Sequence, residues 1–347
     1  PGGSRRTGGA GPGGGSSMMP LANDPAAGRG WKTACDGMAA CAVCLLAGFG
    51  CRTAGPAVKP DPAIDRPTAA ALAAFDAGRA DQAALLYSQA LDQARRTDRS
   101  LEISACAYNL AACQAAQGHY ADALVSLDEA RLEHDLSGAP PAELTLLEAR
   151  ILAAQGRAPE VVALALGELP HRPAGRDPVR LQWQLLLTQG LCDQGRNGDA
   201  EAALARLNER ALRAAPPALR AEAATLRARL ALTSGRMDAA AAAWDEAARH
   251  WRAAGRFPEM VQALGQAAEA FATAGCPSEA AGRAYRAARS LAASGLWQRA
   301  LDAGARARTW ADPRMALQLD RLAERCRAEA GGLESAMPPS ALTNAAR

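Results

Sequence analysis

The chain has 347 residues, of which 49% are apolar and only 4% are aromatic, and its formal net charge is +3. Alanine dominates the apolar residues, which favours closely packed helices and argues against a β-sandwich, because strands are rich in Val, Ile, Thr and aromatic residues. Arginine is interspersed with Asp and Glu, so the sequence lacks the basic run or stripe that is typical of nucleic-acid-binding faces.

The first 50 residues read as a leader and an export signal. Residues 1–17 are rich in Gly, Pro and Ser, and we expect them to be a disordered or non-native leader. Residues 18–50 resemble a signal peptide, because Arg29 and Lys32 precede a 12-residue apolar run that is too short to span a bilayer. The run ends in LAGFGC, which resembles a bacterial lipoprotein signal and implies that Cys51 is lipidated. An export signal without a lipid and no export at all stay open, since Gly48 stands where lipoproteins prefer Leu.

Residues 51–66 are Pro-rich and show no helical period, so we expect a semi-extended tether. Residues 67–330 show helical periodicity throughout and are expected to form a single helical repeat domain. Residues 331–347 are expected to be a disordered tail. The tether and the lipidated cysteine together predict a folded body held at some distance from a membrane.

The repeat domain contains six copies of a helix–turn–helix pattern. Each copy is centred on a glycine, and consecutive glycines are 40, 38, 39, 40 and 40 residues apart. Glycine is unfavourable within a helix and favourable directly after its end, so it is expected to mark the turn. The turn glycines are Gly78, Gly118, Gly156, Gly195, Gly235 and Gly275.

Other positions recur at fixed distances from the turn glycine. Five residues after it, the sequence has a small or β-branched residue that would let two helices approach closely: Ala83, Ala123, Val161, Ala200, Ala240 and Ala280. Proline is frequent near the start of the first helix of each pair, at Pro67, Pro141, Pro178, Pro217 and Pro258. Asp177 and Asp312 each precede a proline and are expected to cap the helices that follow.

Helix pairs of this kind resemble tetratricopeptide repeats, and the best match is the second copy, with NLA at 109–111, GHY at 118–120, Ala123 and Ala130. The resemblance implies an all-α fold, a right-handed superhelical solenoid of about six antiparallel helix pairs. The period of about 39 residues exceeds the usual 34, which implies longer helices or longer loops between repeats. After the last turn glycine, helices are expected at 278–293, 296–309 and 313–329.

The sequence contains no recognisable catalytic or metal-binding pattern. His119, His134, His171 and His250 are far apart and no H-E-x-x-H motif occurs. The five cysteines of the repeat domain, Cys106, Cys113, Cys192, Cys276 and Cys326, include no C-x-x-C pair, so we expect free thiols that pack as small apolar groups. We therefore expect no enzymatic activity, no cofactor and no metal ion.

In the resembling family, the first helix of each pair lines a concave groove. Carried onto this sequence, the resemblance implies a partner-binding wall of Glu143, Arg150, Gln182, Gln189, Asp193, Glu222, Thr225, Arg229, Gln262, Gln266 and Glu269. The second copy would contribute a smooth surface of Ala105, Tyr108, Ala112 and Ala116 to the same groove. A polar face that only contacts water is the alternative for the wall, because polar residues belong at the surface in any case.

These observations predict a non-enzymatic scaffold that binds protein or peptide partners, without nucleic acid. With the export signal, they predict a lipid-anchored protein of a bacterial cell envelope that faces the periplasm. The alternative is a cytosolic regulator or sensor of the same repeat type that binds a peptide or a small ligand. A third possibility is the accessory helical part of an enzyme whose catalytic domain lies elsewhere.

Overall fold

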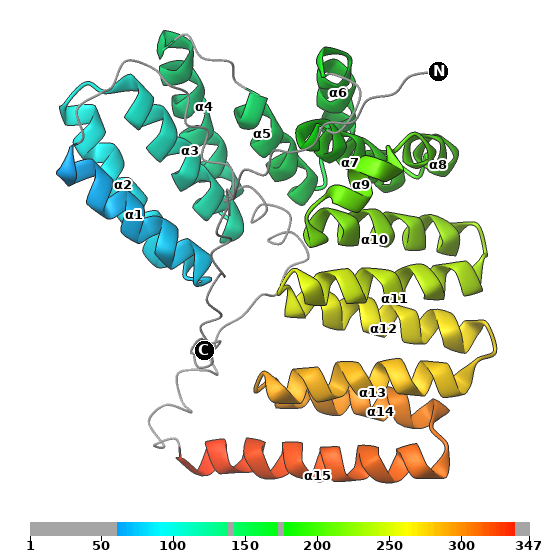
Figure 1. Ribbon diagram of the computed structural model, residues 1–347. Coiled ribbons are helices and arrows are strands. Elements are labelled where there is room, and N and C mark those ends of the chain that lie inside the picture. Colours follow the sequence, from blue (N-terminus) through cyan, green and yellow to red (C-terminus); the bar gives the residue numbers. More distant parts are fainter. Residues whose placement is uncertain (1–60, 138–141, 173–176, 337–347) are drawn as a thin grey trace, which may run out of the picture. The chain divides into compact units, whose positions relative to one another are not determined.

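A computed structural model describes residues 61–137, 142–172 and 177–336 (Figure 1). The side chains of residues 137, 142 and 331–336 are not described. All regular elements in these ranges are helical, and they lie in one compact unit of the chain, Ala34–Arg347. The α-helices are α1 (Pro62–Asp76), α2 (Ala80–Arg96), α3 (Ser100–Ala116), α4 (Tyr120–Ser137), α5 (Ala142–Ala154), α6 (Ala158–Glu168), α7 (Pro178–Asp193), α8 (Asn197–Ala205), α9 (Glu209–Ala214), α10 (Pro217–Thr233), α11 (Met237–Ala253), α12 (Phe257–Thr273), α13 (Pro277–Ala293), α14 (Trp297–Trp310) and α15 (Pro313–Ala336). One 3-10 turn, η2 (Leu169–His171), follows α6.

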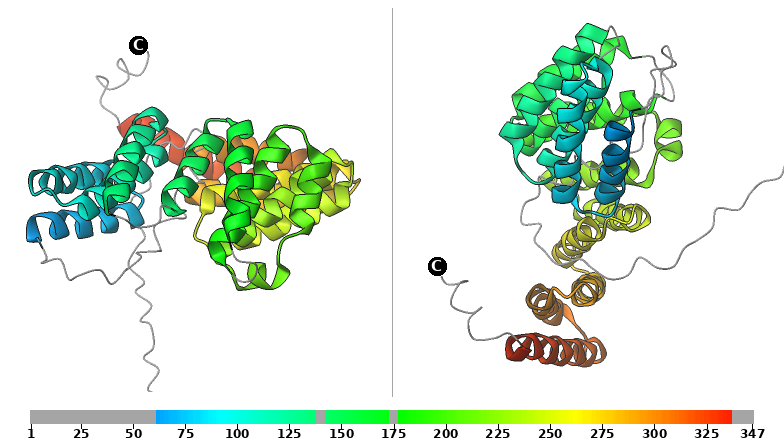
Figure 2. Two further views of the ribbon diagram at one scale, coloured as in Figure 1. Left: turned by 90° about the horizontal axis from the view of Figure 1, so that it is seen from above. Right: turned by 90° about the vertical axis from the view of Figure 1, so that its left-hand side faces the viewer.

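Except for α8 and α9, which contact α7 and α10, each helix packs mainly against the helices before and after it in sequence. Figures 1 and 2 show neighbouring helices running back and forth side by side. The pairs are α1/α2, α3/α4, α5/α6, α7/α8, α10/α11 and α12/α13. We call the two members of each pair the first and the second helix. The predicted all-α solenoid of helix pairs is therefore confirmed for the described residues.

The predicted turn glycines all have a positive φ, between 70° and 81°. At Gly118, the glycine N–H donates to the Ala115 carbonyl over 3.1 Å, and the next N–H, of His119, donates to the Gln114 carbonyl over 2.9 Å. These two bonds satisfy carbonyl groups that the end of α3 leaves without a helical partner. A side chain would be strained at this φ, so the sequence requires glycine here.

The small residues predicted at the helix contacts are buried. Ala83, Ala123, Val161, Ala200, Ala240 and Ala280 have no exposed surface. The extra residues of the long repeat lie within the helices, because α10, α11, α12 and α13 each have 17 residues. Gly255 also has a positive φ, and it ends α11 in a turn between two pairs that the sequence alignment of the six copies does not mark.

Two predicted boundaries differ from the structure. The first helix begins at Pro62 and not at Pro67, because Asp61 caps it by accepting a hydrogen bond from the Ala63 N–H over 2.9 Å. Pro67 lies inside this helix, so residues 62–66 of the predicted tether are helical. The last helix continues to Ala336, into the segment expected to be a tail. The predictions for residues 1–17, for the signal at 18–50 and for Cys51 lie outside the described residues.

The predicted caps are confirmed. The Asp177 carboxylate accepts from the Val179 N–H at the start of α7, and the Asp312 carboxylate accepts from the Met315 N–H at the start of α15. The three C-terminal helices begin and end within one or two residues of the expected positions, except for the longer end of α15.

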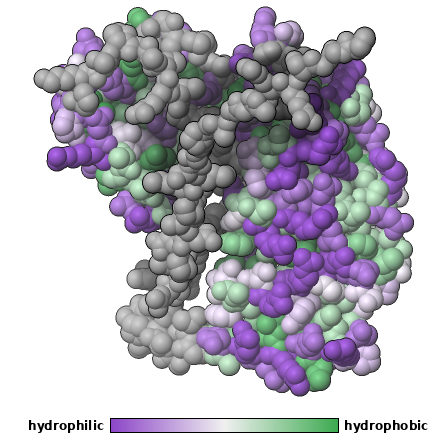
Figure 3. Space-filling model, viewed as in Figure 1, coloured by the Kyte–Doolittle hydropathy of each residue, from purple (hydrophilic) through white to green (hydrophobic). Residues whose placement is uncertain are grey.

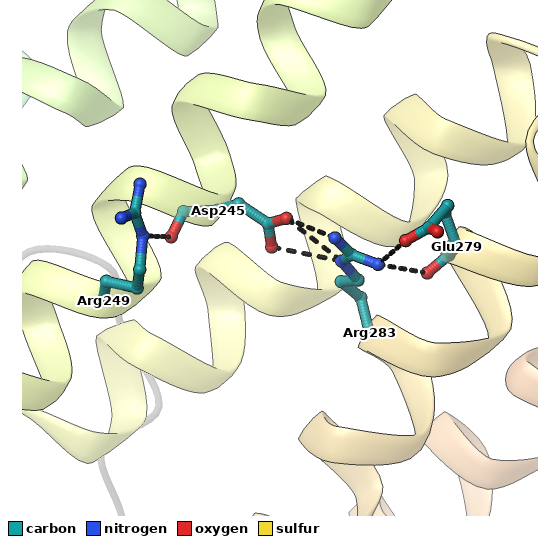
Figure 4. Close-up of polar contacts among 4 residues, drawn as sticks. All are labelled: Asp245, Arg249, Glu279 and Arg283. Carbon is teal, nitrogen blue, oxygen red and sulfur yellow. Dashed lines mark hydrogen bonds and ion pairs between the residues drawn. The ribbon is translucent and has the colours of Figure 1, made fainter.

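Second helices of neighbouring pairs are joined by ion pairs. The guanidinium of Arg283 on α13 donates from Nη2 and Nε to Asp245 on α11, over 2.7 and 3.0 Å, and it also pairs with Glu279 (Figure 4). Its Cζ lies 4.6 Å from the centre of the Phe271 ring on α12. A planar cation that contacts a carboxylate and an aromatic face in this way fixes the spacing of three helices. Figure 3 shows hydrophilic and hydrophobic residues interspersed over α10–α15 on the face in view.

No helix among the described residues has the length and apolarity needed to cross a bilayer.

Candidate functional site

The residues predicted to line the groove all lie on first helices. Glu143 and Arg150 are on α5, and the other nine are distributed over α7, α10 and α12. The structure brings part of this set together and leaves the rest spread along the first helices. We call the eleven residues the first-helix set: Glu143, Arg150, Gln182, Gln189, Asp193, Glu222, Thr225, Arg229, Gln262, Gln266 and Glu269.

Arg150 connects three first helices. Its Nη2 donates to Oε1 of Gln182 on α7 over 3.1 Å, and its Nη1 lies 3.6 Å from Oε1 of Glu222 on α10. Arg150 and Gln182 are only 1% and 5% exposed, whereas the Glu222 side chain is 21% exposed. The expectation that Arg150 and Gln182 form an accessible wall is therefore wrong. Both residues are interior, because α5, α7 and α10 lie close enough to cover them.

Burial raises the pKa of the Glu222 carboxyl, and the nearby guanidinium groups of Arg150 and Arg256 oppose this shift. Burial also raises the pKa of the Tyr108 hydroxyl on α3; the charge of Glu143 adds to the shift and that of Arg150 reduces it. Tyr108 and Glu143 thus belong to the electrostatic surroundings of Arg150. We call Tyr108, Glu143, Arg150, Gln182 and Glu222 the Arg150 cluster.

Outside this cluster, one ion pair links the first helices α7 and α10, and another links α12 to α14. Arg229 on α10 donates to Asp193 on α7 over 2.6 Å, and Arg306 on α14 donates to Glu269 on α12 over 3.3 Å. All four side chains are at least partly exposed, so each pair contributes little to stability in water. Their positions nevertheless place charges of alternating sign along α7, α10, α12 and α14.

The other members of the first-helix set differ in exposure. Gln262 is exposed, whereas Gln189 and Gln266 are partly exposed. The Thr225 hydroxyl is buried and makes no hydrogen bond with another described residue. The polar face predicted for α12 is therefore accessible, while the polar residues nearer the centre of the domain are largely enclosed.

A hollow of about 200 Å³ lies between α12, α13 and α14. Its floor consists of small and apolar side chains, and its rim carries charged groups from α12 and α14. The residues that line it are Val261, Gly265, Ala268, Glu269, Ala284, Ala287, Leu291, Arg299, Asp302, Ala303, Arg306 and Trp310. Glu269 was predicted from the sequence, but the α14 residues were not, because the six-copy alignment ends before this helix. We call this hollow the α12–α14 hollow.

A second hollow, of about 180 Å³, lies between α7 and α9. Most of its polar side chains stabilise the surrounding helix ends and connections, so it is a weaker candidate for a binding site. Of its polar residues, Asp177 and Asn208 serve as helix caps, and Arg180 donates to the carbonyl groups of Leu169 and Arg172 over 2.8 and 2.7 Å. These groups hold the irregular connections around α9 in place. Gln184 and Arg206 are the polar residues of its lining that have no such structural role.

The thiol groups are poor candidates for chemistry. The cysteines at 106, 113, 192, 276 and 326 form no disulfide among the described residues; Cys106, Cys113 and Cys326 are buried, and the other two are partly exposed. Burial raises the pKa of Cys106, Cys192 and Cys326, which disfavours the reactive thiolate. Among residues 61–137, 142–172 and 177–330, no three His, Cys, Asp or Glu side chains are placed to hold a metal ion.

No family model and no curated protein matches this chain. Solved structures similar to it include a tetratricopeptide repeat protein from Parabacteroides merdae, at 14% identity over 77% of this chain and 100% of that chain, with a TM-score of 0.43. The TPR2AB domain of yeast Sti1, solved in a pHSP90 complex, matches at 21% identity over 76% and 98% of the two chains, with a TM-score of 0.29.

A Rap protein complexed with competence and sporulation factor matches at 13% identity over 77% of this chain and 86% of that chain, with a TM-score of 0.34. The assignment of the fold rests on the helix pairs, turn glycines and buried alanines described above. By these features, the described part of the chain is a tetratricopeptide-like helical solenoid.

Proposed function

We propose that this protein is a non-enzymatic helical-repeat scaffold that binds a protein or peptide partner on α12 and the helices that follow it. The observation that carries the proposal is the α12–α14 hollow, which combines an apolar floor with a charged rim. Helical or extended peptides are commonly held in this way, with apolar side chains in a groove and polar contacts along its edge. Glu269 and Arg306 lie on the rim, and either can exchange its partner for a group on a ligand.

The hollow suits this role better than the Arg150 cluster does. Arg150 and Gln182 are buried and already contact each other, so a partner would have to separate them to reach either side chain. The floor of the hollow is open, and a Cβ placed on Gly265 would meet no other atom within 4 Å. A partner could therefore approach the backbone of α12 without displacing any side chain.

The open space at Gly265 also provides the test. Gly265→Leu would fill the hollow while keeping the helix, since leucine favours helices more than glycine does. Gly282→Leu is a matched control, because Gly282 is a helical glycine with the same free space and lies on α13 outside the lining of the hollow. Both variants should fold and melt at or above the wild-type temperature.

Partners captured from membrane extracts by the wild type should be retained by Gly282→Leu and lost by Gly265→Leu, as judged by quantitative mass spectrometry. Equal capture by all three proteins would place the binding surface elsewhere.

We further propose that the protein is lipid-anchored in a bacterial envelope through Cys51 and faces the periplasm. Support comes from the sequence, in which an apolar run leads to Cys51 and a Pro-rich segment follows. Metabolic labelling with palmitate should mark the wild type and not Cys51→Ala. Equal labelling of the two, or none in either, would contradict the anchor; an unlabelled, unprocessed protein in the soluble fraction would favour the cytosolic regulator instead.

A further inference from the structure

The outward face of α4 carries large apolar side chains that no other described element covers. Val125, Leu132 and Leu136 are 70%, 61% and 70% exposed. Their spacings of seven and four residues place them on one line along the helix. We call these three residues the α4 ridge. Exposed leucines that occur singly need no explanation, but a line of them on one helix marks an interaction surface.

The repeat does not require this ridge. The same three positions lie 7, 14 and 18 residues after the turn glycine, and in α11 they carry Ala242, Arg249 and Ala253. In α13 they carry Gly282, Arg289 and Ala293. Second helices with small or charged outward residues therefore pack just as well, so contact within the solenoid does not account for Val125, Leu132 and Leu136.

Carboxylates border the ridge on both sides. By helical spacing, Asp122, Glu129 and Glu133 lie along one side, and Asp128 and Asp135 lie along the other. Arginine neutralises two of these groups: Arg95 on α2 pairs with Glu129 at 2.6 Å, and Arg131 pairs with Asp128 at 3.2 Å and with Glu148 on α5 at 2.8 Å. No ion pair between described residues involves Asp122, Glu133 or Asp135. Residues 61–137 contain 12 Asp and Glu against 6 Arg, a net charge of −6.

We propose that the α4 ridge docks a cationic amphipathic helix of a partner protein. Such a helix would lay its leucine-like stripe on Val125, Leu132 and Leu136, and its flanking Lys or Arg side chains would reach the bordering carboxylates. The two interhelix ion pairs join α4 to α2 and to α5 beside this face and leave the ridge itself uncovered.

Charge argues against two other occupants. A membrane surface with anionic lipids would repel the carboxylates that border the ridge. The ridge of a second copy would bring the same carboxylates face to face, and like charges at an interface are unfavourable. A cationic helix is the occupant whose apolar stripe and charge both complement this face.

The test uses the full chain and a synthetic helical peptide that has leucine on one face and lysine on either side. A scrambled peptide of the same composition keeps the charge and loses the stripe. Binding is followed by fluorescence anisotropy with wild type, with Leu132→Glu/Leu136→Glu and with Leu317→Glu, a control on α15 whose leucine is also exposed. Because all three leucines face solvent, circular dichroism should confirm that each variant folds.

The proposal expects the amphipathic peptide to bind the wild type and the Leu317→Glu control alike, and to bind Leu132→Glu/Leu136→Glu at least about tenfold more weakly. Asp122→Asn/Asp135→Asn should weaken binding less and should reduce its dependence on salt. Equal affinity for the scrambled peptide, or unchanged affinity of the Leu132→Glu/Leu136→Glu variant, would overturn it. So would a wild-type dimer in sedimentation, or binding to phosphatidylglycerol vesicles, that this variant abolishes.

Discussion

The C-terminal helices α10–α14 and the central helices α5–α9 use the same repeat in different ways. In the C-terminal part, α10–α13 have 17 residues each and pack through alanines that have no exposed surface, such as Ala228, Ala240 and Ala267. In the central part the helices are shorter and unequal, with 13 residues in α5, 11 in α6 and 6 in α9. Their interior contains large side chains, including Trp183 and Ile151, and the buried guanidinium of Arg150.

The difference teaches what makes a repeat regular. Alanine contacts bring helix backbones together at a distance that hardly varies, so each pair is placed like the one before it. Large and charged side chains require particular partners, because an interior packed to crystal density has no room for misplacement. The central helices are therefore positioned by individual contacts, such as the close approach of α7 to α6, where a Cβ on Gly190 would lie 2.9 Å from a methyl group of Val162.

The largest expected effect is the loss of an alanine contact. Ala240→Arg would force a long charged side chain into a fully buried position on α11, and it should cost about 4 kcal/mol or more of unfolding free energy. Ala242→Arg on the same helix is the control, because Ala242 is exposed and its replacement should change the free energy by less than about 0.5 kcal/mol. Urea unfolding followed by circular dichroism measures both. Equal midpoints would show that alanine contacts do not set the regular spacing.

Removal of the Arg150 guanidinium should have the next largest effect on the free energy of unfolding. Arg150→Ala leaves Glu222 and Gln182 without their buried partner, and it should cost about 3 kcal/mol, toward the lower end for a broken buried pair because Glu222 is partly hydrated. Arg157→Ala is the control, since its ion pair with Glu160 is exposed and should contribute little to stability. If Glu222→Gln restored none of the loss in the Arg150→Ala background, the two residues would not be coupled.

The smallest expected effect is a dependence on pH. Because the pKa of Glu222 is raised in the folded chain, the folded state keeps this proton to a higher pH than the unfolded state does. The stabilisation is thus complete below the unfolded pKa and is lost as the pH rises through the folded pKa. Glu222→Gln should lack this loss.

Subtracting the urea-unfolding profile of Glu222→Gln from that of the wild type should isolate the contribution of Glu222. The difference between the wild-type and Asp320→Asn profiles should have the opposite slope against pH, because the hydrogen bond from Arg308 lowers the pKa of Asp320. Identical profiles for wild type and Glu222→Gln would contradict the raised pKa.

The regular part of the fold follows from local sequence signals. Gly235 and Ala240 recur at fixed offsets in other copies, and a positive φ or a close helix contact admits few other residues at such positions. The start of α1 was missed because Asp61 and Pro62, a cap followed by a first-turn proline, were assigned to the tether. Gly255 was missed because only the turns within pairs were compared, and Gly255 lies in a turn between two pairs.

The candidate site could be predicted only in part. Helical spacing places Arg150 on the face that meets α7, but it does not give the distance between α5 and α10, which depends on the short helices and connections between them. The spacing therefore predicts the face on which Arg150 lies, but it does not predict that Arg150 is buried. Glu269 was found because it lies on a predicted first helix, whereas Arg306 and Trp310 lie on a helix beyond the six aligned copies.

The twenty-residue spacing of Gly235, Gly255, Gly275 and Gly295 has a consequence for how the length of this chain can change. A tandem duplication of the 40 residues between Gly235 and Gly275 would begin and end at equivalent backbone positions. The inserted pair would meet alanine-lined neighbours on both sides, so no existing contact would have to be rebuilt. A single unequal crossover in this part of the gene could add or remove one complete helix pair, whereas a similar event in the central part would disrupt the contacts of Arg150.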